Sequence, residues 1–327
     1  MSKIITVQNL SKTYTYYKKQ AGLKGTFLHL FNRQKFYTRA VKEISFTIDE
    51  GELVGFLGPN GAGKTTTLKM LSGILYPTSG SAEVLGFIPW KRKREYLKQI
   101  SIVMGQKAQL WWDLPARESF LLSQAIYDIA KTDYAERLAS LSKMLDVVSL
   151  LDIPIRKLSL GERMKMELIN SLLHNPRALF LDEPTIGLDV VAQKTMRDFL
   201  RSYNQEYGTT ILLTSHYMED VEALCKRVIV VNNGEVMYDG LLKSVVDRFA
   251  PYKVLKLTFL KEVQKQDIAQ YGKITSFEPI KAELTVGRDK TTSIAAEILQ
   301  KFPVDDIIID EMSVEDVVRR MFAEQKI

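Results

Sequence analysis

Residues 58–66 read Gly-Pro-Asn-Gly-Ala-Gly-Lys-Thr-Thr and follow the apolar run Leu53-Val54-Gly55-Phe56-Leu57. An apolar strand, a glycine-rich turn and a helix, predicted here over residues 65–71, together form a phosphate-binding loop. The glycines let successive backbone N–H groups turn toward one anion, and the helix N-terminus adds partial positive charge at the same place. This stretch therefore predicts that the chain binds a nucleoside triphosphate.

The side chains of the loop have separate predicted roles. Lys64 is expected to reach the β- and γ-phosphates, and the Thr65 hydroxyl is expected to ligate Mg²⁺. The predicted nucleotide-binding residues of this loop are Gly58, Asn60, Gly61, Ala62, Gly63, Lys64, Thr65 and Thr66.

The bulk composition sets outer limits on the class of protein. A chain of 327 residues has room for one large domain and a small one. No run approaches the roughly 18–20 apolar residues that a membrane-spanning helix needs. The single cysteine, Cys225, excludes an internal disulfide framework and is expected to be a small buried hydrophobe. Residues 1–42 carry nine Lys or Arg and no Asp or Glu, which suits either an anionic partner or a solvated surface.

The patterning along the chain predicts two domains. Residues 1–14 and 40–49 are expected to form strands of an antiparallel hairpin, separated by a basic and aromatic insert, Thr15–Arg39, with a short amphipathic helix at its centre. A mainly helical stretch follows from Trp112 to about Asn175. The expected buried strands then lie at residues 178–181, 210–214 and 228–231, and a hairpin turn at 232–234 leads into a strand at 235–238.

The character of the sequence changes near Ala250-Pro251. Beyond it the patterns predict a small α+β domain over residues 251–327, separate from a domain at 1–245. Its expected strands are 253–260, 273–277, 283–286 and 307–309, and its expected helices are 293–301 and 314–322.

Two carboxylates end the expected strand at 178–181, where the sequence reads Ala-Leu-Phe-Leu-Asp-Glu through Glu183. The carboxyl ends of parallel strands share one sheet edge, so this pair should lie beside the phosphate-binding loop. Asp182 can then hold Mg²⁺, and Glu183 can orient or deprotonate the attacking water. Two solvated acids are the plainer alternative, which the following Pro184–Asp189 segment disfavours.

A second glycine-containing motif, Leu158-Ser159-Leu160-Gly161-Glu162, opens a helix that runs to about Leu173. Ser159 and Glu162 have the spacing of a capping box, which is one interpretation of the motif. Gly161 costs helix stability and indicates a close approach, which at a helix N-terminus can be that of a phosphate. The expected buried stripe of the helix consists of Leu160, Met164, Leu168 and Leu172.

In this order, the motifs over about residues 1–240 resemble those of the ATP-binding cassette (ABC) ATPases. Gly58–Thr66 matches Walker A, Leu158–Glu162 the signature, Leu179–Glu183 Walker B and Thr185–Asp189 the D-loop, while Gln106 matches the Q-loop glutamine and His216 the switch histidine. The resemblance implies an α/β P-loop fold with a mixed sheet core, an antiparallel β subdomain and a helical subdomain at about 107–173.

The resemblance also implies a site that two cassettes share. Each ATP would lie between Walker A of one cassette and Ser159 and Gly161 of the other. Glu183 would be the general base, His216 the γ-phosphate sensor, and Gln106 a link between Mg²⁺ and the helical subdomain, so that the expected metal ligands are Thr65, Gln106 and Asp182. Tyr14 is the expected adenine-stacking residue, with Tyr16, Tyr17 and Tyr37 as rivals. The common signature is Leu-Ser-Gly-Gly-Gln, and a carboxylate at Glu162 is expected to weaken ATP closure by repulsion.

The cassette needs a partner to do work, and transport is favoured over action on ribosomes or DNA. Ribosomal cassettes usually carry two P-loops, and DNA-repair cassettes carry a long coiled coil before the signature.

The expected partners are integral-membrane permeases on separate chains and a second cassette, identical or paralogous, with no nucleic acid. The expected place is the cytoplasmic face of the membrane, as a peripheral subunit. The C-terminal portion ends in Ser313–Val318 and resembles the tail of cassettes that serve exporters of drugs, lipids or polysaccharides. An importer subunit is the runner-up. Trp111-Trp112 is interpreted either as an exposed docking anchor or as core.

Overall fold

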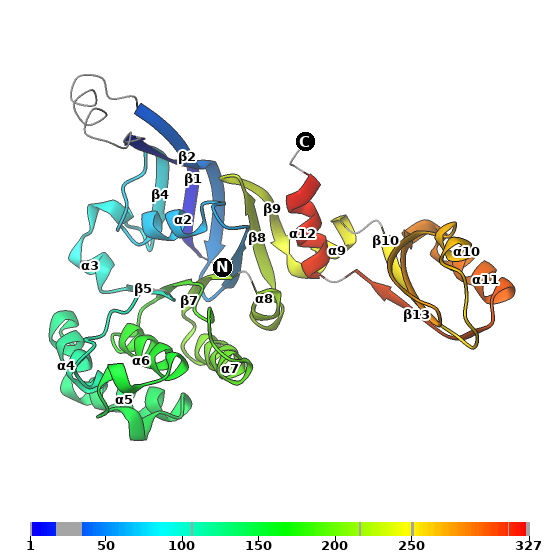
Figure 1. Cartoon of the computed structure of the whole chain (residues 1–327). Coiled ribbons are helices and arrows are strands. Elements are labelled where there is room, and N and C mark those ends of the chain that lie inside the picture. The colour runs from blue at the N-terminus through cyan, green and yellow to red at the C-terminus, as the bar shows by residue number, and fades with distance from the viewer. Residues whose placement is uncertain are drawn as a thin grey trace, which may run out of the picture. The chain divides into compact units, whose positions relative to one another are not determined.

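The computed structural model describes residues 2–17, 35–105, 107–215, 217–249, 252–312 and 314–324 (Figure 1). Its internal contacts divide the chain into two compact units, Met1–Asp239 and Gly240–Ile327. The described residues form three sheets, of six, four and three strands.

The centre of the first unit is the six-stranded sheet, in the order β5-β6-β7-β3-β8-β9. The first four neighbouring pairs in this order are parallel, so the carboxyl ends of these five strands meet at one edge. Phe56, Phe180 and Ile229 are fully buried, as expected for parallel strands that are covered on both faces. The strands are β3 (Leu53–Leu57), β5 (Ile100–Met104), β6 (Ala178–Asp182), β7 (Thr210–Ser215), β8 (Arg227–Asn232) and β9 (Glu235–Leu241).

Three helices follow strands of this sheet: α2 (Lys64–Leu71), α7 (Val190–Tyr207) and α8 (Met218–Leu224). α2 begins within the glycine-rich loop, one residue before the predicted start. α7 begins where the Asp189 carboxylate accepts a hydrogen bond from the Ala192 N–H at 2.8 Å, and it ends at Gly208, whose φ is 65°. Both ends of α7 are therefore set by local capping.

The smaller sheet of the first unit has the order β2-β1-β4 and is antiparallel. Its strands are β1 (Lys3–Tyr17), β2 (Lys35–Asp49) and β4 (Ser79–Val84). The strands extend further than predicted, so the predicted insert Thr15–Arg39 was drawn too wide. Aromatic residues continue the ladder there, with the Tyr16 and Phe36 rings stacked at 5.7 Å. The helix predicted at the centre of the insert lies outside the described residues.

The helical part of the first unit consists mainly of α4 (Ala116–Tyr127), α5 (Lys131–Met144) and α6 (Leu160–Leu172). α6 buries Met164, Leu168 and Leu172, but Leu160 is 38% exposed. The predicted stripe was wrong for Leu160 because this first helical residue lies beside Gly187 rather than in the core. The short elements are α3 (Arg94–Leu97), η1 (Pro89–Lys91), η2 (Val148–Leu150) and η3 (Ile155–Lys157).

The second unit contains a four-stranded antiparallel sheet in the order β11-β12-β10-β13. Its core joins Leu255, Leu257 and Leu284 of the sheet to Ile268 of α10 and Ile298 of α11. α9 and α10 were not predicted. The elements are α9 (Leu242–Phe249), β10 (Tyr252–Phe259), α10 (Lys265–Ala269), β11 (Lys273–Glu278), β12 (Lys281–Gly287), η4 (Arg288–Lys290), α11 (Thr291–Lys301), β13 (Val304–Glu311) and α12 (Val314–Glu324).

The described helices were also compared with the requirements of a membrane span. None of them is both long enough and apolar enough to cross a bilayer.

Candidate functional site

Two close backbone contacts shape the glycine-rich loop between β3 and α2. A Cβ at Gly58 would lie 2.3 Å from the Val231 carbonyl oxygen, and a Cβ at Gly63 would lie 2.4 Å from the Ala40 carbonyl oxygen. Gly63 also has a φ of 101°, which L side chains rarely adopt. Only glycine fits at these two positions, and the loop is consequently packed tightly against β8 and β2.

Lys64 is held inside this loop and is only 5% exposed. Its Nζ donates to the carbonyl oxygens of Gly58 at 2.6 Å and Pro59 at 3.3 Å. Burial lowers the pKa of Lys64, while the carboxylates of Glu183 and Asp182 act in the opposite direction. The ammonium donates to the loop's own carbonyl oxygens. The charged oxygens of a phosphate would be stronger acceptors for the same ammonium.

Asp182, at the end of β6, connects the start of α2 to the end of β7. The Thr65 hydroxyl donates to its carboxylate, with Oγ1 lying 2.8 Å and 3.1 Å from the two carboxylate oxygens. The Thr214 hydroxyl, at the end of β7, donates to Oδ1 at 2.7 Å. Thr214 was not predicted, although the rule that parallel strands end at one edge could have indicated it.

This oxygen cluster fits a hard cation such as Mg²⁺. Hydroxyl and carboxylate oxygens are hard ligands, and Mg²⁺ is usually bound by one or two such groups together with phosphates and waters. Among the residues that the structure describes, no three His, Cys, Asp or Glu side chains gather as a dedicated metal cage. Thr65 and Asp182 are therefore the described residues that would hold the ion.

Glu183 follows Asp182 in an unusual backbone conformation, with a φ of 54°. Its N–H is held by the carbonyl oxygen of Thr214 at 3.0 Å and by the Thr214 hydroxyl at 3.1 Å. A Cβ at Gly105 would lie only 2.1 Å from the Glu183 carbonyl oxygen. Gly105 thus allows the chain after β5 to approach Glu183, the expected general base. Gly105 was not predicted as a site residue.

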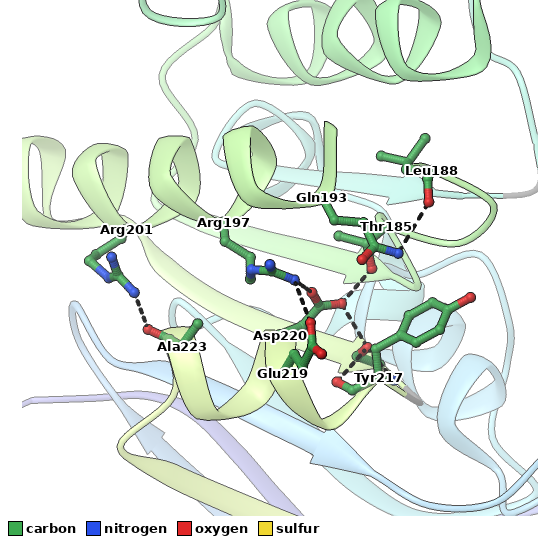
Figure 2. A network of polar contacts seen from close by, with 10 residues as sticks. Thr185, Leu188, Gln193, Arg197, Arg201, Tyr217, Glu219, Asp220 and Ala223 are labelled. Atoms are coloured by element: carbon green, nitrogen blue, oxygen red, sulfur yellow. Dashed lines mark hydrogen bonds and ion pairs between the residues drawn. The ribbon is translucent and has the colours of Figure 1, made fainter. Parts of the chain in front are cut away.

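A buried acid, Asp220, connects the segment after Glu183 to α7 and α8 (Figure 2). It is fully buried and accepts hydrogen bonds from the Thr185 hydroxyl, the Ser215 hydroxyl at 3.0 Å and Arg197 Nη1 at 2.9 Å. Sequence analysis missed this network because its members come from four separate segments. It fixes Thr185, at the start of the D-loop match, relative to the end of β7.

The predicted capping box at the start of α6 is present. The Ser159 Oγ accepts a hydrogen bond from the Glu162 N–H at 3.3 Å, and the Glu162 carboxylate accepts one from the Ser159 N–H at 2.8 Å. The close approach at Gly161 is made by Ala192 of α7, since a Cβ at Gly161 would lie 3.1 Å from the Ala192 Cβ. Both features are therefore accounted for within the chain, and a phosphate contact here stays a prediction.

The remaining predicted site residues are placed as follows. Lys64, Thr65, Asp182 and Glu183 gather at one edge of the six-stranded sheet, whereas Ser159 and Gly161 make their contacts with Glu162 and Ala192. Tyr14 lies on β1, is 39% exposed, and has the Lys12 Nζ 5.5 Å from its ring centroid. Gln106 and His216 lie outside the described residues.

The segment before α4 carries the two adjacent tryptophans, which are each 49% exposed. A pocket of about 420 Å³ is lined by β5, the residues before it, and the C-terminal end of α4, and neither tryptophan lines it. Its walls include Gln109, Ile126 and Tyr127, and basic residues Arg92, Arg94 and Lys98. Of the two interpretations of the tryptophan pair, the structure favours the exposed one over the core one.

The chain was compared with known families and proteins. A family model described as "ABC transporter" matches residues 41–186, and one described as "EvrA-like ABC transporter, C-terminal domain" matches residues 251–310. The chain is 36% identical over 217 residues to the ABC transporter ATP-binding protein NatA of Bacillus subtilis, covering 66% of this chain and 88% of NatA.

Two further relatives have names that describe transport. The bacitracin transport ATP-binding protein BcrA of Bacillus licheniformis is 34% identical, over 63% of this chain and 67% of BcrA. The Nod factor export ATP-binding protein I of Burkholderia thailandensis is 36% identical, over 63% of this chain and 67% of that protein.

Solved structures share the fold. A dimeric bacterial ABC transporter cassette superposes with a TM-score of 0.60 at 24% identity, covering 72% of this chain and 98% of the cassette. A Clostridium perfringens protein that is part of an ABC transporter complex superposes with a TM-score of 0.61 at 26% identity, covering 76% of this chain and 92% of that protein.

Proposed function

Because this chain belongs to the ABC transporter family and is an ATP-binding, ATP-hydrolysing cassette, we propose that it drives export through permease subunits on separate chains. The single observation that supports export best is the naming of its relatives, which include a bacitracin transport and a Nod factor export protein. The proposed location is the cytoplasmic face of the membrane, as a peripheral subunit, with cargo of the drug, lipid or polysaccharide type. The proposed domains are 1–245 for the cassette and 251–327 for a C-terminal domain.

The proposed ATP site starts from the glycine-rich loop. Its backbone N–H groups and Lys64 bind the phosphates, and Tyr14 stacks on the adenine. Thr65 and Asp182, with Gln106, hold Mg²⁺, which when bound neutralises charge on the phosphates. Glu183 is the base that takes the proton of the attacking water, and His216 senses the γ-phosphate. The hydrogen bond from Thr214 to Asp182 orients the Asp182 carboxylate, and the hydrogen bond from the Glu183 N–H to Thr214 holds the backbone of Glu183 beside it.

The second half of the site is proposed to come from a second cassette. Ser159 and Gly161 contact Glu162 of α6 and Ala192 of α7 in their own chain, and the helix N-terminus leaves backbone N–H groups for an anion. The Glu162 carboxylate is held in the capping box by the Ser159 N–H at 2.8 Å. This tie limits its freedom to approach a phosphate and so offsets part of the repulsion expected from an acid in the signature.

The permease is proposed to dock on the exposed tryptophan pair, and the pocket lined by β5 and the C-terminal end of α4 is proposed as a second contact. Large aromatic side chains that are half exposed supply anchors for a partner at low entropy cost. The pocket adds cationic side chains of Arg92, Arg94 and Lys98, and Asp128 pairs with the latter two at 2.7 Å each. A permease segment with both apolar and acidic residues would fit this surface.

The first experiment tests the ATPase cycle with a Glu183→Gln variant of the full chain. The variant is expected to bind ATP, to accumulate as a nucleotide-dependent dimer in light scattering, and to lose steady turnover by at least about 100-fold. Glu219→Gln is the matched control, because Glu219 is an acid with a side chain that is 78% exposed on α8. Retained turnover in Glu183→Gln would remove Glu183 from the role of base.

The second experiment tests partner and direction. The tagged chain is purified from native membranes, with and without a Trp111→Ala, Trp112→Ala double substitution, and co-purifying polytopic proteins are identified. We expect a permease that is lost with the double substitution, and ATP-dependent movement of cargo out of the cell. Movement into the cell would support the importer alternative, and recovery of ribosomes or DNA in place of a permease would overturn transport.

A further inference from the structure

Residues 107–115, which carry Trp111 and Trp112 and are called the tryptophan loop below, are attached to α6 by a buried carboxylate. Glu167 lies in the third turn of α6 and is 7% exposed. Its Oε1 accepts hydrogen bonds from the backbone N–H groups of Gln109 at 2.7 Å and Leu110 at 3.2 Å. Burial raises the pKa of Glu167, and the two backbone hydrogen bonds act in the opposite direction. Burial of a carboxyl group costs free energy that an apolar side chain would not cost. The hydrogen bonds between Glu167 and two successive N–H groups of the loop therefore need an explanation.

The same loop is held by residues one turn and more before Glu167. The Arg163 guanidinium lies over the Trp112 ring, 4.9 Å from its centroid. Residues 163 and 167 are four apart and therefore lie on one face of the helix. Arg156, just before α6, donates its backbone N–H to the Trp112 carbonyl oxygen at 3.0 Å and its side chain to Asp113 at 3.1 Å. The loop thus contacts α6, and the segment just before α6, through Gln109, Leu110, Trp112 and Asp113.

We propose that Glu167 is a positioning residue that makes the tryptophan loop and the signature end of α6 one rigid body, so that a displacement at Trp111-Trp112 is delivered to Ser159 and Gly161. The inference rests on the proposed function, because it gives the docking surface a route to the shared ATP site. From Glu167 to Ser159 is eight residues of one straight helix, about 12 Å at the usual rise. A helix transmits motion over that length with little loss, provided that its attachment to the loop does not slip.

A purely structural role makes a different prediction. If Glu167 only satisfied two N–H groups, its loss would lower stability but leave the nucleotide response at the tryptophans intact. A positioning role requires that the tryptophans respond when nucleotide closes the site, and that this response disappears when the tie is cut. The emission response is therefore measured beside dimer formation, which shows that a variant still folds and binds nucleotide.

The experiment uses the full chain with a Trp90→Phe substitution. The sequence has three tryptophans, so this background leaves emission from Trp111 and Trp112 alone. Emission is recorded on saturation with Mg²⁺ and a non-hydrolysable ATP analogue, and dimer formation is measured by light scattering in the same samples. Glu167→Met removes the acceptor and puts an apolar, unbranched side chain of similar length in its place. Glu167→Gln keeps an acceptor oxygen.

The matched control is Ser123→Ala. Ser123 of α4 donates to Asn170 of α6, the helix that also carries Glu167, at 2.7 Å. Its loss removes a partly buried hydrogen bond of α6 that does not involve the tryptophan loop. The nucleotide-dependent emission change is expected in the background chain, in Ser123→Ala and largely in Glu167→Gln. In Glu167→Met it is expected to fall at least about threefold while dimer formation remains.

Two results would overturn the inference while leaving the proposed function in place. These are a dimer without any emission change in the background chain, and an undiminished change in Glu167→Met. Failure of the background chain to dimerise would instead refute the proposed function, and the inference with it. If Glu167→Met does not fold, Glu167→Asp takes its place, because the shorter side chain withdraws the acceptor from the N–H groups of Gln109 and Leu110. An emission change as large as that of the background chain in Glu167→Asp would then refute the inference.

Discussion

Within the network around Asp220, we expect removal of the Asp220 carboxylate to lower the free energy of unfolding more than any other single substitution. The salt bridge joins Arg197 Nη1 and Asp220 Oδ1 at 2.9 Å, with side chains that are 12% and 1% exposed. Breaking a buried pair by removing one partner costs about 3–5 kcal/mol, because the other charge stays buried without its counter-ion. Asp220→Ala also deprives the Thr185 and Ser215 hydroxyls of their common acceptor.

The structure indicates where in this range the cost will fall. Glu219 lies 3.8 Å from the same guanidinium nitrogen and can take over part of the charge, which favours the lower half. Ser215 can retain Tyr217, whose carbonyl oxygen lies at 3.2 Å. We therefore expect a loss of about 3–4 kcal/mol in the free energy of unfolding of the first unit.

The assay is urea unfolding followed by tryptophan emission, which reports the first unit because Trp90, Trp111 and Trp112 all lie within it. A double variant, Asp220→Leu with Arg197→Met, replaces the pair by apolar side chains and is expected to recover much of the loss. A loss below about 1 kcal/mol in Asp220→Ala, the size of an exposed ion pair, would refute the reasoning. So would a double variant that is no more stable than Asp220→Ala.

Three further outcomes are expected. Gly105→Ala should lower ATP turnover at least about tenfold with a smaller change in ATP affinity, since its Cβ would lie 2.1 Å from the Glu183 carbonyl oxygen; unchanged steady-state kinetics would contradict this. Thr65→Val should raise the Mg²⁺ concentration for half-maximal turnover by about tenfold or more, and an unshifted Mg²⁺ titration would exclude the hydroxyl as a ligand. Burial lowers the pKa of His174 to about 4 from 6.5, so the folded state prefers the neutral ring; its stabilisation is complete above pH 6.5 and is lost as pH falls toward 4. The free energy of unfolding should therefore decrease by about 2 kcal/mol from His174 between pH 7.5 and 5, and His174→Phe, which can still stack on Tyr127, should remove this slope.

Local sequence patterns were sufficient where one segment forms the feature by itself. The glycine-rich loop followed by α2, the capping box of Ser159 and Glu162, and the helical stretch before residue 175 all depend on residues within a few positions of each other. The residue types that mark these features lie next to each other along the chain, so that a local pattern reveals them. The buried Cys225 was also anticipated and is confirmed, at 5% exposed.

Sequence patterns failed where a residue's surroundings come from another segment. Leu160 has the spacing of a core residue but lies at the exposed start of α6, and the strands β1 and β2 run further into the predicted insert than their polarity indicated. Gly161 did mark a close approach, yet the neighbour is Ala192 of α7, which no pattern within residues 158–162 could reveal.

The sequence by itself determined that the chain holds a triphosphate, because one contiguous loop contains the glycines, Lys64 and Thr65 that phosphate binding needs. Only the tertiary structure decided which groups surround that loop. The sheet order places β6 beside β7 and β5 beside β6, although these strands are far apart in sequence. Thr214 therefore meets Asp182 and Gly105 meets the Glu183 carbonyl, while the packing of α6 brings Glu167 to the tryptophan loop. Such contacts depend on strand order and helix packing, which arise from burial of the whole core rather than from any local pattern.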